Sequence, residues 1–253
     1  MNKEQLKLIV KRTLPIPVRN YLKSQWQRDK LYPPFGKVGF GNLRSLKPIS
    51  DCWGIDRGQP VDRYYIENFL ADHSSDIQGR VLEIGDNSYT LRFGGDNIKK
   101  SDVLHAIEGN PEATIVGDLS NANHIPSDTF DCFILTQTLQ YVYDLQSGLK
   151  TIYRILKPGG IVLATLPSIT PLSDAQWNKC WYWGFTTVST QRLFEEVFTP
   201  ANIQVKTYGN VLTASAFLQG LASQELRKEE LDYRDSNYEV TITVRAVKPQ
   251  VMS

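Results

Sequence analysis

Two short apolar runs separated by a helical pattern constrain the fold of this chain most. The runs are DCFILT (131–136) and IVLATL (161–166). Each is too short for an ordinary helix and is apolar through its middle, which is typical of a strand covered on both faces. Between them, apolar residues recur every three or four positions and predict a helix: Leu145, Leu149, Ile152 and Leu156. A strand–helix–strand unit of this size predicts a parallel sheet covered by helices, and therefore the α/β class.

The flanking segments extend this pattern. VDRYYIENFLADH (61–73) follows a proline and predicts a helix, and RVLEIG (80–85) predicts a strand. Two further strand-like runs lie at 101–104 and 113–116, and KPGG (157–160) predicts the end of a helix and a turn. Residues 239–247 alternate between apolar and polar side chains, which predicts a half-exposed antiparallel strand at or near the sheet edge.

Charge is unevenly divided along the chain. Residues 1–50 contain eleven Lys or Arg and two acids, a formal charge of +9, whereas the other 17 basic and 25 acidic residues give −8. We therefore expect a basic helical N-terminal extension and loop (1–50) and an α/β domain (51–253). The amphipathic stripes of the extension predict packing on the domain, or peripheral contact with an anionic membrane or a partner protein. Nucleic acid is not an expected partner, because the acidic body offers no continuous basic surface.

The cysteines predict reduced thiols and a cytoplasmic protein. Cys52, Cys132 and Cys180 are odd in number and far apart, and the sequence has no CxxC or HExxH pattern. We therefore expect neither a disulfide framework nor a bound metal. The first residues lack the long apolar stretch of a cleaved signal peptide, and no apolar run is long enough to cross a bilayer.

Candidate site residues follow four of the predicted strands. In an open α/β sheet, ligands bind beyond the carboxyl ends of the strands. The residues at these ends are Glu83, Gly85, Asp86 and Asn87, then Asp102 and Val103, then Asp118 and Leu119, and finally Gln137. An acid ending the second strand can accept hydrogen bonds from ribose hydroxyls, and an acid beside an apolar residue suits an adenine ring.

These positions also have purely structural interpretations. Glu83 can cap the local backbone, Asp102 and Asp118 can be turn residues that follow strands, and Gln137 can be a satisfied polar residue at the end of its strand. His124 lies in the loop after the third strand and is expected to be a surface residue rather than a catalytic base.

This series of strand ends resembles the class I S-adenosylmethionine-dependent methyltransferases, from about residue 80 to residue 186. IPSDTFDCFILTQTLQYVYDLQSGLKTIYRILKPGG (125–160) is similar to the family's block of Phe-Asp, apolar strand, leucine-rich helix and Leu-Lys-Pro-Gly-Gly. WYWGFT (181–186), FGNLRSLKPIS and IDRGQPVDRYYIENFL resemble a compact subgroup encoded with polysaccharide genes. The resemblance implies a Rossmann-like methyltransferase sandwich, with a mostly parallel seven-stranded sheet and an antiparallel strand near the C-terminus.

The resemblance also implies the chemistry. S-adenosylmethionine would be the cofactor, bound by the nine strand-end residues named above, and a saccharide or cell-surface glycan precursor would accept the methyl group. No catalytic residue is implied, although Tyr89, Tyr141 and Trp181 could flank the sulfonium by cation–π contact. The alternative function is an inactive module that serves as scaffold or partner for a glycan-assembly enzyme. A glycosyltransferase would then be a partner of the basic extension.

The sequence departs from the family at two places. The family's cofactor loop is acid-x-Gly-x-Gly-x-Gly, and here Asn87 and Tyr89 replace the second and third glycines. We expect Asn87 to keep the turn through a positive φ, and the ring of Tyr89 to crowd the loop. Gly184 stands where the subgroup has an arginine.

Overall fold

The chain divides into two compact units, residues 1–46 and 47–253. The computed structural model describes residues 15–18, 21, 32–172 and 178–250. The amphipathic stripes expected in residues 1–30 lie mostly outside the described residues. The described part of the first unit includes a short 3-10 helix, Gly41–Leu43. The expected boundary between residues 50 and 51 falls inside the second unit.

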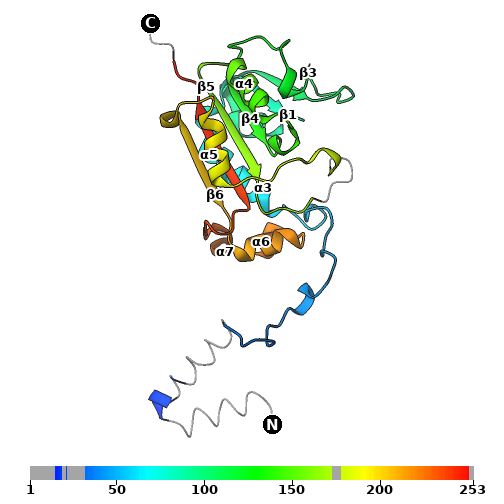
Figure 1. Ribbon diagram of the computed structural model, residues 1–253, viewed down its shortest axis with the longest axis vertical. Coiled ribbons are helices and arrows are strands. Elements are labelled where there is room, and N and C mark those ends of the chain that lie inside the picture. The colour runs from blue at the N-terminus through cyan, green and yellow to red at the C-terminus, as the bar shows by residue number, and fades with distance from the viewer. Residues whose placement is uncertain (1–14, 19–20, 22–31, 173–177, 251–253) are drawn as a thin grey trace. The chain divides into compact units, whose positions relative to one another are not determined.

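The second unit is built on one mixed sheet (Figure 1). In its described residues, seven strands follow the order β3-β2-β1-β4-β5-β7-β6. Their bounds are β1 Gly79–Ile84, β2 Ile98–His105, β3 Ile115–Val116, β4 Phe130–Thr136, β5 Leu156–Pro167, β6 Ile203–Tyr208 and β7 Thr241–Val247. β7 is antiparallel to β5 and β6, and the other neighbours are parallel. This arrangement confirms the expected α/β fold, with the strand order reversing between β1 and β4.

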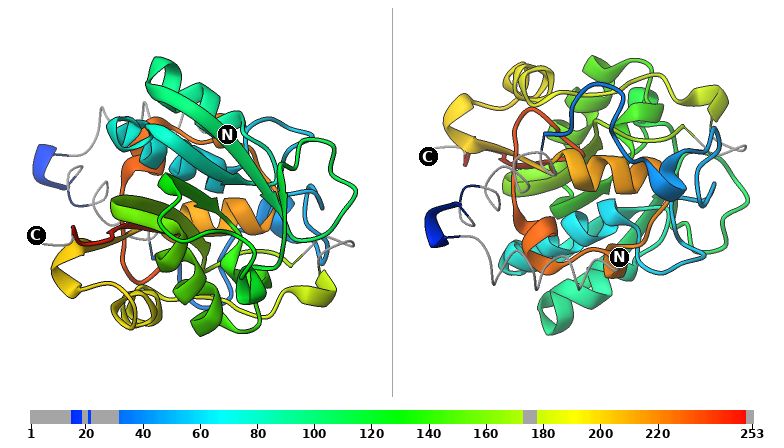
Figure 2. Two further views of the ribbon diagram at one scale, coloured as in Figure 1. Left: turned by 90° about the horizontal axis from the view of Figure 1, so that it is seen from above. Right: turned by 90° about the horizontal axis from the view of Figure 1, so that it is seen from below.

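Helices cover both faces of the sheet, as the two end-on views in Figure 2 show. The helices are α3 (Val61–Asp72), α4 (Leu145–Ile155), α5 (Thr187–Glu195), α6 (Val211–Leu218) and α7 (Lys228–Asp232). α4 and α5 share one apolar cluster with the sheet, and α3 shares another with the opposite face. α6 and α7 pack together with the first turns of α3 in a third cluster.

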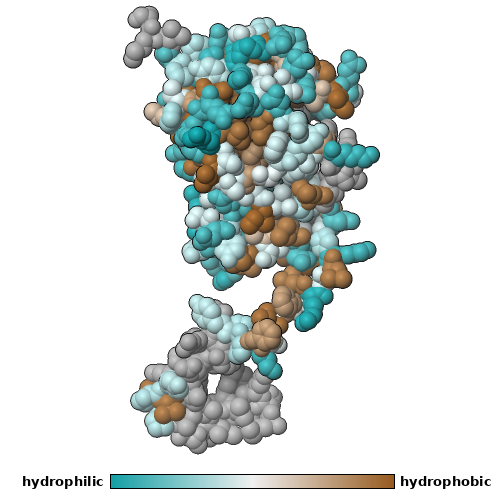
Figure 3. Space-filling view, viewed as in Figure 1, coloured by the Kyte–Doolittle hydropathy of each residue, from teal (hydrophilic) through white to brown (hydrophobic). Residues whose placement is uncertain are grey.

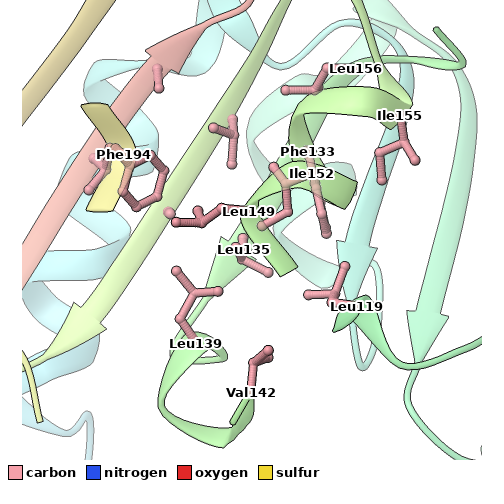
Figure 4. Packing of buried hydrophobic residues seen from close by; sticks show 14 of the residues in the cluster. Leu119, Phe133, Leu135, Leu139, Val142, Leu149, Ile152, Ile155, Leu156 and Phe194 are labelled. Carbon is pink, nitrogen blue, oxygen red and sulfur yellow. The ribbon is translucent and has the colours of Figure 1, made fainter. Parts of the chain in front are cut away.

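The α4 face shows why the predicted helix forms where it does. Leu149, Ile152 and Ile155 lie on one side of α4, are completely buried and belong to the same cluster as Phe133 and Leu135 of β4 (Figure 4). Burying a side chain of this size contributes about 1.5–3 kcal/mol. The helix begins at Asp144, whose Oδ1 accepts a hydrogen bond of 3.0 Å from the Ser147 amide.

α4 ends at Ile155, directly before residues 157–160, as predicted. The pairing of β5 with β4 then passes from Leu156 opposite Phe130 to Ile161 opposite Cys132, so residues 157–160 bulge out of the strand, with Gly159 at a φ of +82°. The Lys157 Nζ lies 2.7 Å from the Asp131 Oδ2 at the start of β4. This ion pair joins the two ends of the strand–helix–strand unit.

The antiparallel strand predicted over residues 239–247 is confirmed as β7, which lies between β5 and β6, one place in from the sheet edge. The prediction that one face of this strand is exposed is wrong. Thr241 and Thr243, on its polar side, are buried, and α3 contacts the strand. Arg245 donates through Nε to the Asp76 Oδ2 at 2.7 Å. Alternation therefore arises here because threonine is tolerated in a buried sheet, not because one face meets water.

Among the described residues, no helix is long and apolar enough to span a membrane. Figure 3 shows polar residues over much of the visible face of the second unit, with smaller apolar areas between them. The sheet and its two helical layers bury most of the two apolar runs, residues 131–136 and 161–166.

Candidate functional site

A buried carboxylate organises the turn that follows β1. Glu83 is 2% exposed and accepts hydrogen bonds from the amides of Tyr89 (3.2 Å) and Thr90 (2.7 Å), and from the Thr90 hydroxyl (2.7 Å). Burial raises the pKa of Glu83 to about 7, although these hydrogen bonds oppose the shift. Glu83 thus caps the backbone of the next helical turn, which is the structural interpretation considered for it.

Gly85 makes the turn itself. Its φ is +84°, a conformation that favours glycine, and a Cβ placed on it would meet nothing within 4 Å. Its amide donates to the Leu104 carbonyl, and its carbonyl accepts from the Asn110 Nδ2 at 2.5 Å. The Gly85 backbone is therefore held by the β2 side of the sheet, and its Cα faces open space at the carboxyl edge.

After Gly85, the loop adopts its conformation without the second and third glycines of the family's pattern. Asn87 does not have a positive φ, contrary to the prediction, and Tyr89 has the helical φ of −73°. The Tyr89 ring packs against Phe93, and its hydroxyl accepts a hydrogen bond of 3.3 Å from Arg63. Exposed Asp86 accepts a bond of 2.8 Å from the Ser88 amide and so begins the helical turn.

The prediction that Asp102 ends the second strand is wrong. β2 runs on to His105, and Asp102 pairs in register with Leu82 in the middle of β1. Its carboxylate is 2.7 Å from the Arg80 Nε and 3.2 Å from the Lys100 Nζ, and is buried beneath them. Val103 is buried in the same strand. Neither residue lies at the carboxyl edge, and Asp102 stabilises the pairing of β1 with β2 instead.

Asp118 and Leu119 follow β3 as predicted, with a structural role for each. Asp118 is exposed and accepts hydrogen bonds of 2.8 Å from both the amide and the hydroxyl of Ser120. Leu119 is buried in the core cluster beneath α4 (Figure 4). Asp118 remains at the edge where a ligand could reach it, whereas Leu119 supports the loop from below. His124 is exposed in the next loop, as expected.

Gln137 lines a pocket of about 250 Å³ beyond the ends of β4 and β5. It follows β4 directly and has an unusual φ of +46°, with its amide bonded to the Thr165 carbonyl. Gln140 also lines the pocket and is 1% exposed; its Nε2 donates to the Gln137 carbonyl at 2.8 Å. The Oε1 of Gln140 is buried and has no hydrogen-bond partner in the described part of the chain. An acceptor atom in that state favours a ligand that donates a hydrogen bond.

Two charged residues from the first turn of α3 complete this pocket, Asp62 and Arg63. Burial raises the pKa of Asp62, and the neighbouring Arg63 opposes that shift only in part. Burial works against the charge of Arg63, but Asp62 and Tyr89 outweigh it and raise the pKa of Arg63. The contact between Arg63 and Tyr89 joins the pocket to the Gly85 turn.

Sequence reasoning missed Asp62, Arg63 and Gln140. Tyr141 and Trp181 also line the pocket, with ring centroids 5.2 Å apart in an edge-to-face arrangement. Tyr141 and Trp181 are two of the three rings that could flank a sulfonium by cation–π contact. Asp62 could have been noticed as a carboxylate in the first turn of the helix that precedes β1. No cluster of His, Cys, Asp and Glu in the described residues could hold a metal ion.

Comparison with known proteins identifies the fold. Residues 79–164, from the start of β1 into β5, match the family described as "Methyltransferase domain". This match covers about a third of the chain and supports the resemblance to the class I methyltransferases. The parallel strands and the reversal of the strand order are those of a Rossmann-like methyltransferase fold, as expected.

Individual relatives agree with this assignment. The ubiquinone/menaquinone biosynthesis C-methyltransferase UbiE of Enterobacter sp. (strain 638) is 33% identical over 152 residues, which cover 54% of this chain and 56% of the relative. UbiE of Escherichia coli (strain K12 / DH10B) is 32% identical over the same length and coverage. The chain spans about half the length of these curated relatives.

A solved structure shows the fold alone. A SAM dependent methyltransferase from Archaeoglobus fulgidus superimposes with a TM-score of 0.50 at 14% identity, covering 74% of this chain and 94% of that chain. The second unit therefore has the expected sheet and helical layers.

Proposed function

We propose that this protein transfers a methyl group from S-adenosylmethionine to a hydroxyl group of a saccharide or glycan precursor. The observation that carries the proposal is the pocket beyond β4 and β5, which is lined by the half-buried carboxylate of Asp62 and by Gln140, whose amide oxygen has no hydrogen-bond partner among the described residues. Both groups accept hydrogen bonds, and a hydroxyl donates one.

The residues around Gly85 fit the methyl donor. Gly85 leaves open space where a cofactor can approach the backbone, and Glu83 holds the turn in place. S-adenosylmethionine has no phosphate, so the loop does not need the several glycines of a dinucleotide site. When bound, it supplies a methyl group activated by a positively charged sulfonium. The rings of Tyr141 and Trp181 can face that charge.

On the acceptor side, Asp62 serves as general base. The hydroxyl oxygen of the acceptor takes the methyl group as the carbon–sulfur bond breaks, and the hydroxyl proton passes to Asp62. Burial raises the pKa of Asp62 and makes it a better base than an exposed carboxylate. Gln140 lines the pocket beside the reacting group, and the aromatic walls limit the access of water.

Methyl transfer to carbon is the second candidate. It is favoured by the similarity to the UbiE C-methyltransferases, whose names refer to ubiquinone and menaquinone biosynthesis. An aromatic-walled pocket would also suit a quinol ring. The saccharide acceptor is preferred because the pocket holds a carboxylate and an amide, both of which can accept hydrogen bonds from the hydroxyls of a polyhydroxylated ligand.

Titration calorimetry with S-adenosylhomocysteine, followed by transfer of radiolabelled methyl groups, tests the proposal. We expect binding, and label in saccharide acceptors rather than in demethylmenaquinol. Label in the quinol alone would support the second candidate. A chain that binds neither S-adenosylmethionine nor S-adenosylhomocysteine would support the non-catalytic scaffold.

The role of Asp62 is tested separately by Asp62→Asn. The variant should lose about 100-fold or more in transfer rate, since a positioned base contributes about 10²–10⁴-fold. The wild-type rate should rise with pH as Asp62 ionises, and that rise should disappear in the variant. Affinity for S-adenosylhomocysteine should be unchanged. Asp96→Asn, an exposed carboxylate at the opposite edge of the sheet, is the control; an equal loss in both variants would contradict the assignment.

A further inference from the structure

Three exposed aromatic rings lie next to the pocket in the sequence and contact one another. Tyr143, Tyr182 and Trp183 are 71%, 48% and 36% exposed. The centroid of the Tyr143 ring is 5.1 Å from that of Tyr182, edge to face, and 6.1 Å from that of Trp183, in a stacked arrangement. We call these three residues the aromatic shelf. Large rings are costly to leave in water, so such a group marks an interaction surface.

The shelf is held in place by hydrogen bonds to the backbone. The indole Nε1 of Trp183 donates to the Val142 carbonyl at 3.0 Å. The amides of Tyr182 and Trp183 both donate to the Gln140 carbonyl, at 2.8 Å and 3.3 Å. The indole nitrogen is therefore already bonded, and its ring is fixed. A surface fixed in this way loses little side-chain entropy when a ligand binds.

The shelf continues the wall of the pocket. Tyr141 and Trp181 line the pocket. Tyr143 lies two residues after Tyr141, and Tyr182 and Trp183 directly follow Trp181. The pocket, at about 250 Å³, is smaller than the usual 300–1,000 Å³ of a site that encloses a whole ligand. The rest of an acceptor whose reacting group enters the pocket must therefore lie outside it, and the shelf is the adjoining surface.

We propose that the aromatic shelf binds a second pyranose ring of an oligosaccharide acceptor, beyond the ring that enters the pocket. This rests on the proposed function and specifies its acceptor as a chain of at least two sugars. The axial C–H bonds of a pyranose carry partial positive charge, and they pack against the negative face of an aromatic ring. The hydroxyls of Tyr143 and Tyr182 have no partner among the described residues and can bond to sugar hydroxyls.

Charge distinguishes a sugar from other partners of aromatic surfaces. Residues 141–144 and 181–184 contain a single charged side chain, Asp144, whose carboxylate is bonded to Ser147. A surface for anionic lipid or nucleic acid would need basic residues beside the rings. A neutral shelf with two phenol hydroxyls fits a neutral sugar ring.

Saturation-transfer NMR and calorimetry on the full chain test the proposal, with cellotetraose, chitotetraose, maltotetraose and mannotetraose as probes. At least one tetrasaccharide should bind, and its monosaccharide should bind at least about tenfold more weakly. Tyr143→Ala should weaken tetrasaccharide binding by up to about tenfold, which corresponds to the 0.5–1.5 kcal/mol of a ring contact. Tyr143→Phe keeps the ring and should retain most of the affinity. Tyr233→Ala removes a ring that is 65% exposed elsewhere and is the control.

The outcomes separate this proposal from the proposed function. All variants should bind S-adenosylhomocysteine like the wild type, because the shelf is distinct from the Gly85 turn. If the wild type binds the cofactor but no tetrasaccharide, the sugar-binding role of the aromatic shelf is wrong and the proposed methyl transfer is unaffected. If the wild type does not bind the cofactor, the proposed function itself is wrong. Binding to phosphatidylcholine vesicles that depends on Tyr143 would identify the shelf as a membrane contact and overturn the sugar assignment.

Discussion

Glu83 is a buried acid whose ionisation is linked to folding. Its pKa is about 7 in the folded chain against 4.5 for an ordinary Glu, because the carboxyl group is removed from water. Folding therefore takes up a proton between these values. The stability that the protonated group contributes is complete below pH 4.5 and is lost as pH rises through 7.

We predict that the free energy of unfolding falls between pH 5 and pH 8 and that Glu83→Gln removes much of this fall. The full linkage of such a shift is about 3 kcal/mol. Glutamine keeps an oxygen for the Thr90 amide and cannot ionise. Urea denaturation of both proteins at each pH provides the measurement. Parallel pH curves for the two proteins would show that another group is responsible.

Substitution of Gly85 can affect cofactor binding by blocking the approach of the cofactor or by straining the backbone, and a second glycine variant distinguishes these two effects. Gly85→Ala and Gly95→Ala each place a Cβ at a positive φ, +84° and +51°, with no atom within 4 Å to clash. Both variants should lose about 1–2 kcal/mol of stability. Only Gly85→Ala should weaken S-adenosylhomocysteine binding, by about tenfold or more, because its Cβ enters the space at the sheet edge. Calorimetry showing equal affinities in the two variants would remove Gly85 from the site.

At the scale of elements, the ion pair between Arg80 and Asp102 joins β1 to β2. Asp102→Asn should lower the free energy of unfolding by about 1–3 kcal/mol, because it weakens charge-assisted bonds to a largely buried group. It should leave S-adenosylhomocysteine affinity unchanged, since Asp102 lies in mid-strand. Measuring both quantities distinguishes this role from ribose binding. A loss of S-adenosylhomocysteine affinity with an unchanged free energy of unfolding would show that Asp102 binds the cofactor.

The elements that the sequence predicted best are those whose apolar pattern has one interpretation. β4 and α4 are examples, because DCFILT (131–136) is apolar through its middle, and apolar residues of α4 such as Leu149 and Ile152 recur every three or four positions. The end of β2 could not be predicted from its apolar run. Lys99 and Lys100 interrupt that run in the amino half of the strand, and the strand continues to the polar residue His105. The buried threonines of β7 show a similar limit, because polar residues in a strand are not always exposed: β7 pairs with β6 at its side and contacts α3.

The candidate site was predictable only where a strand end defines it. Gly85 and Gln137 follow β1 and β4 directly, and both lie at the carboxyl edge. Asp62 could not be placed from sequence, because it approaches the pocket from a helix that precedes the sheet. Its position depends on how α3 packs, which no local pattern encodes. That Gln140 Oε1 has no hydrogen-bond partner among the described residues is likewise a property of the folded pocket.

At the scale of the whole molecule, charge and structure divide the chain in nearly the same place. The first unit, residues 1–46, contains ten Lys or Arg and two acids, a formal charge of +8. All the residues of the three apolar clusters found in the described part of the chain lie between Trp53 and Ala246, in the second unit. The site at the carboxyl edge also belongs to that unit.

We therefore predict that residues 47–253 fold and bind S-adenosylhomocysteine without the first unit. The thermal midpoint should stay within about 3 °C of the full chain, because a loss of 1 kcal/mol would move it by about 2–4 °C at this length. Differential scanning calorimetry measures the midpoint. A substantially lower value would show that the basic extension packs on the domain and stabilises it.

The same truncation tests the peripheral contact expected of the basic extension. The full chain should sediment with vesicles containing phosphatidylserine, and residues 47–253 should not. Each Lys or Arg near such a surface contributes about 1 kcal/mol, and salt screens the attraction over about 8 Å at physiological ionic strength. Binding should therefore fall steeply when sodium chloride is raised, and vesicles of phosphatidylcholine are the control. If the truncated chain bound these anionic vesicles as strongly as the full chain, the contact would belong to residues 47–253 and the extension would need another partner.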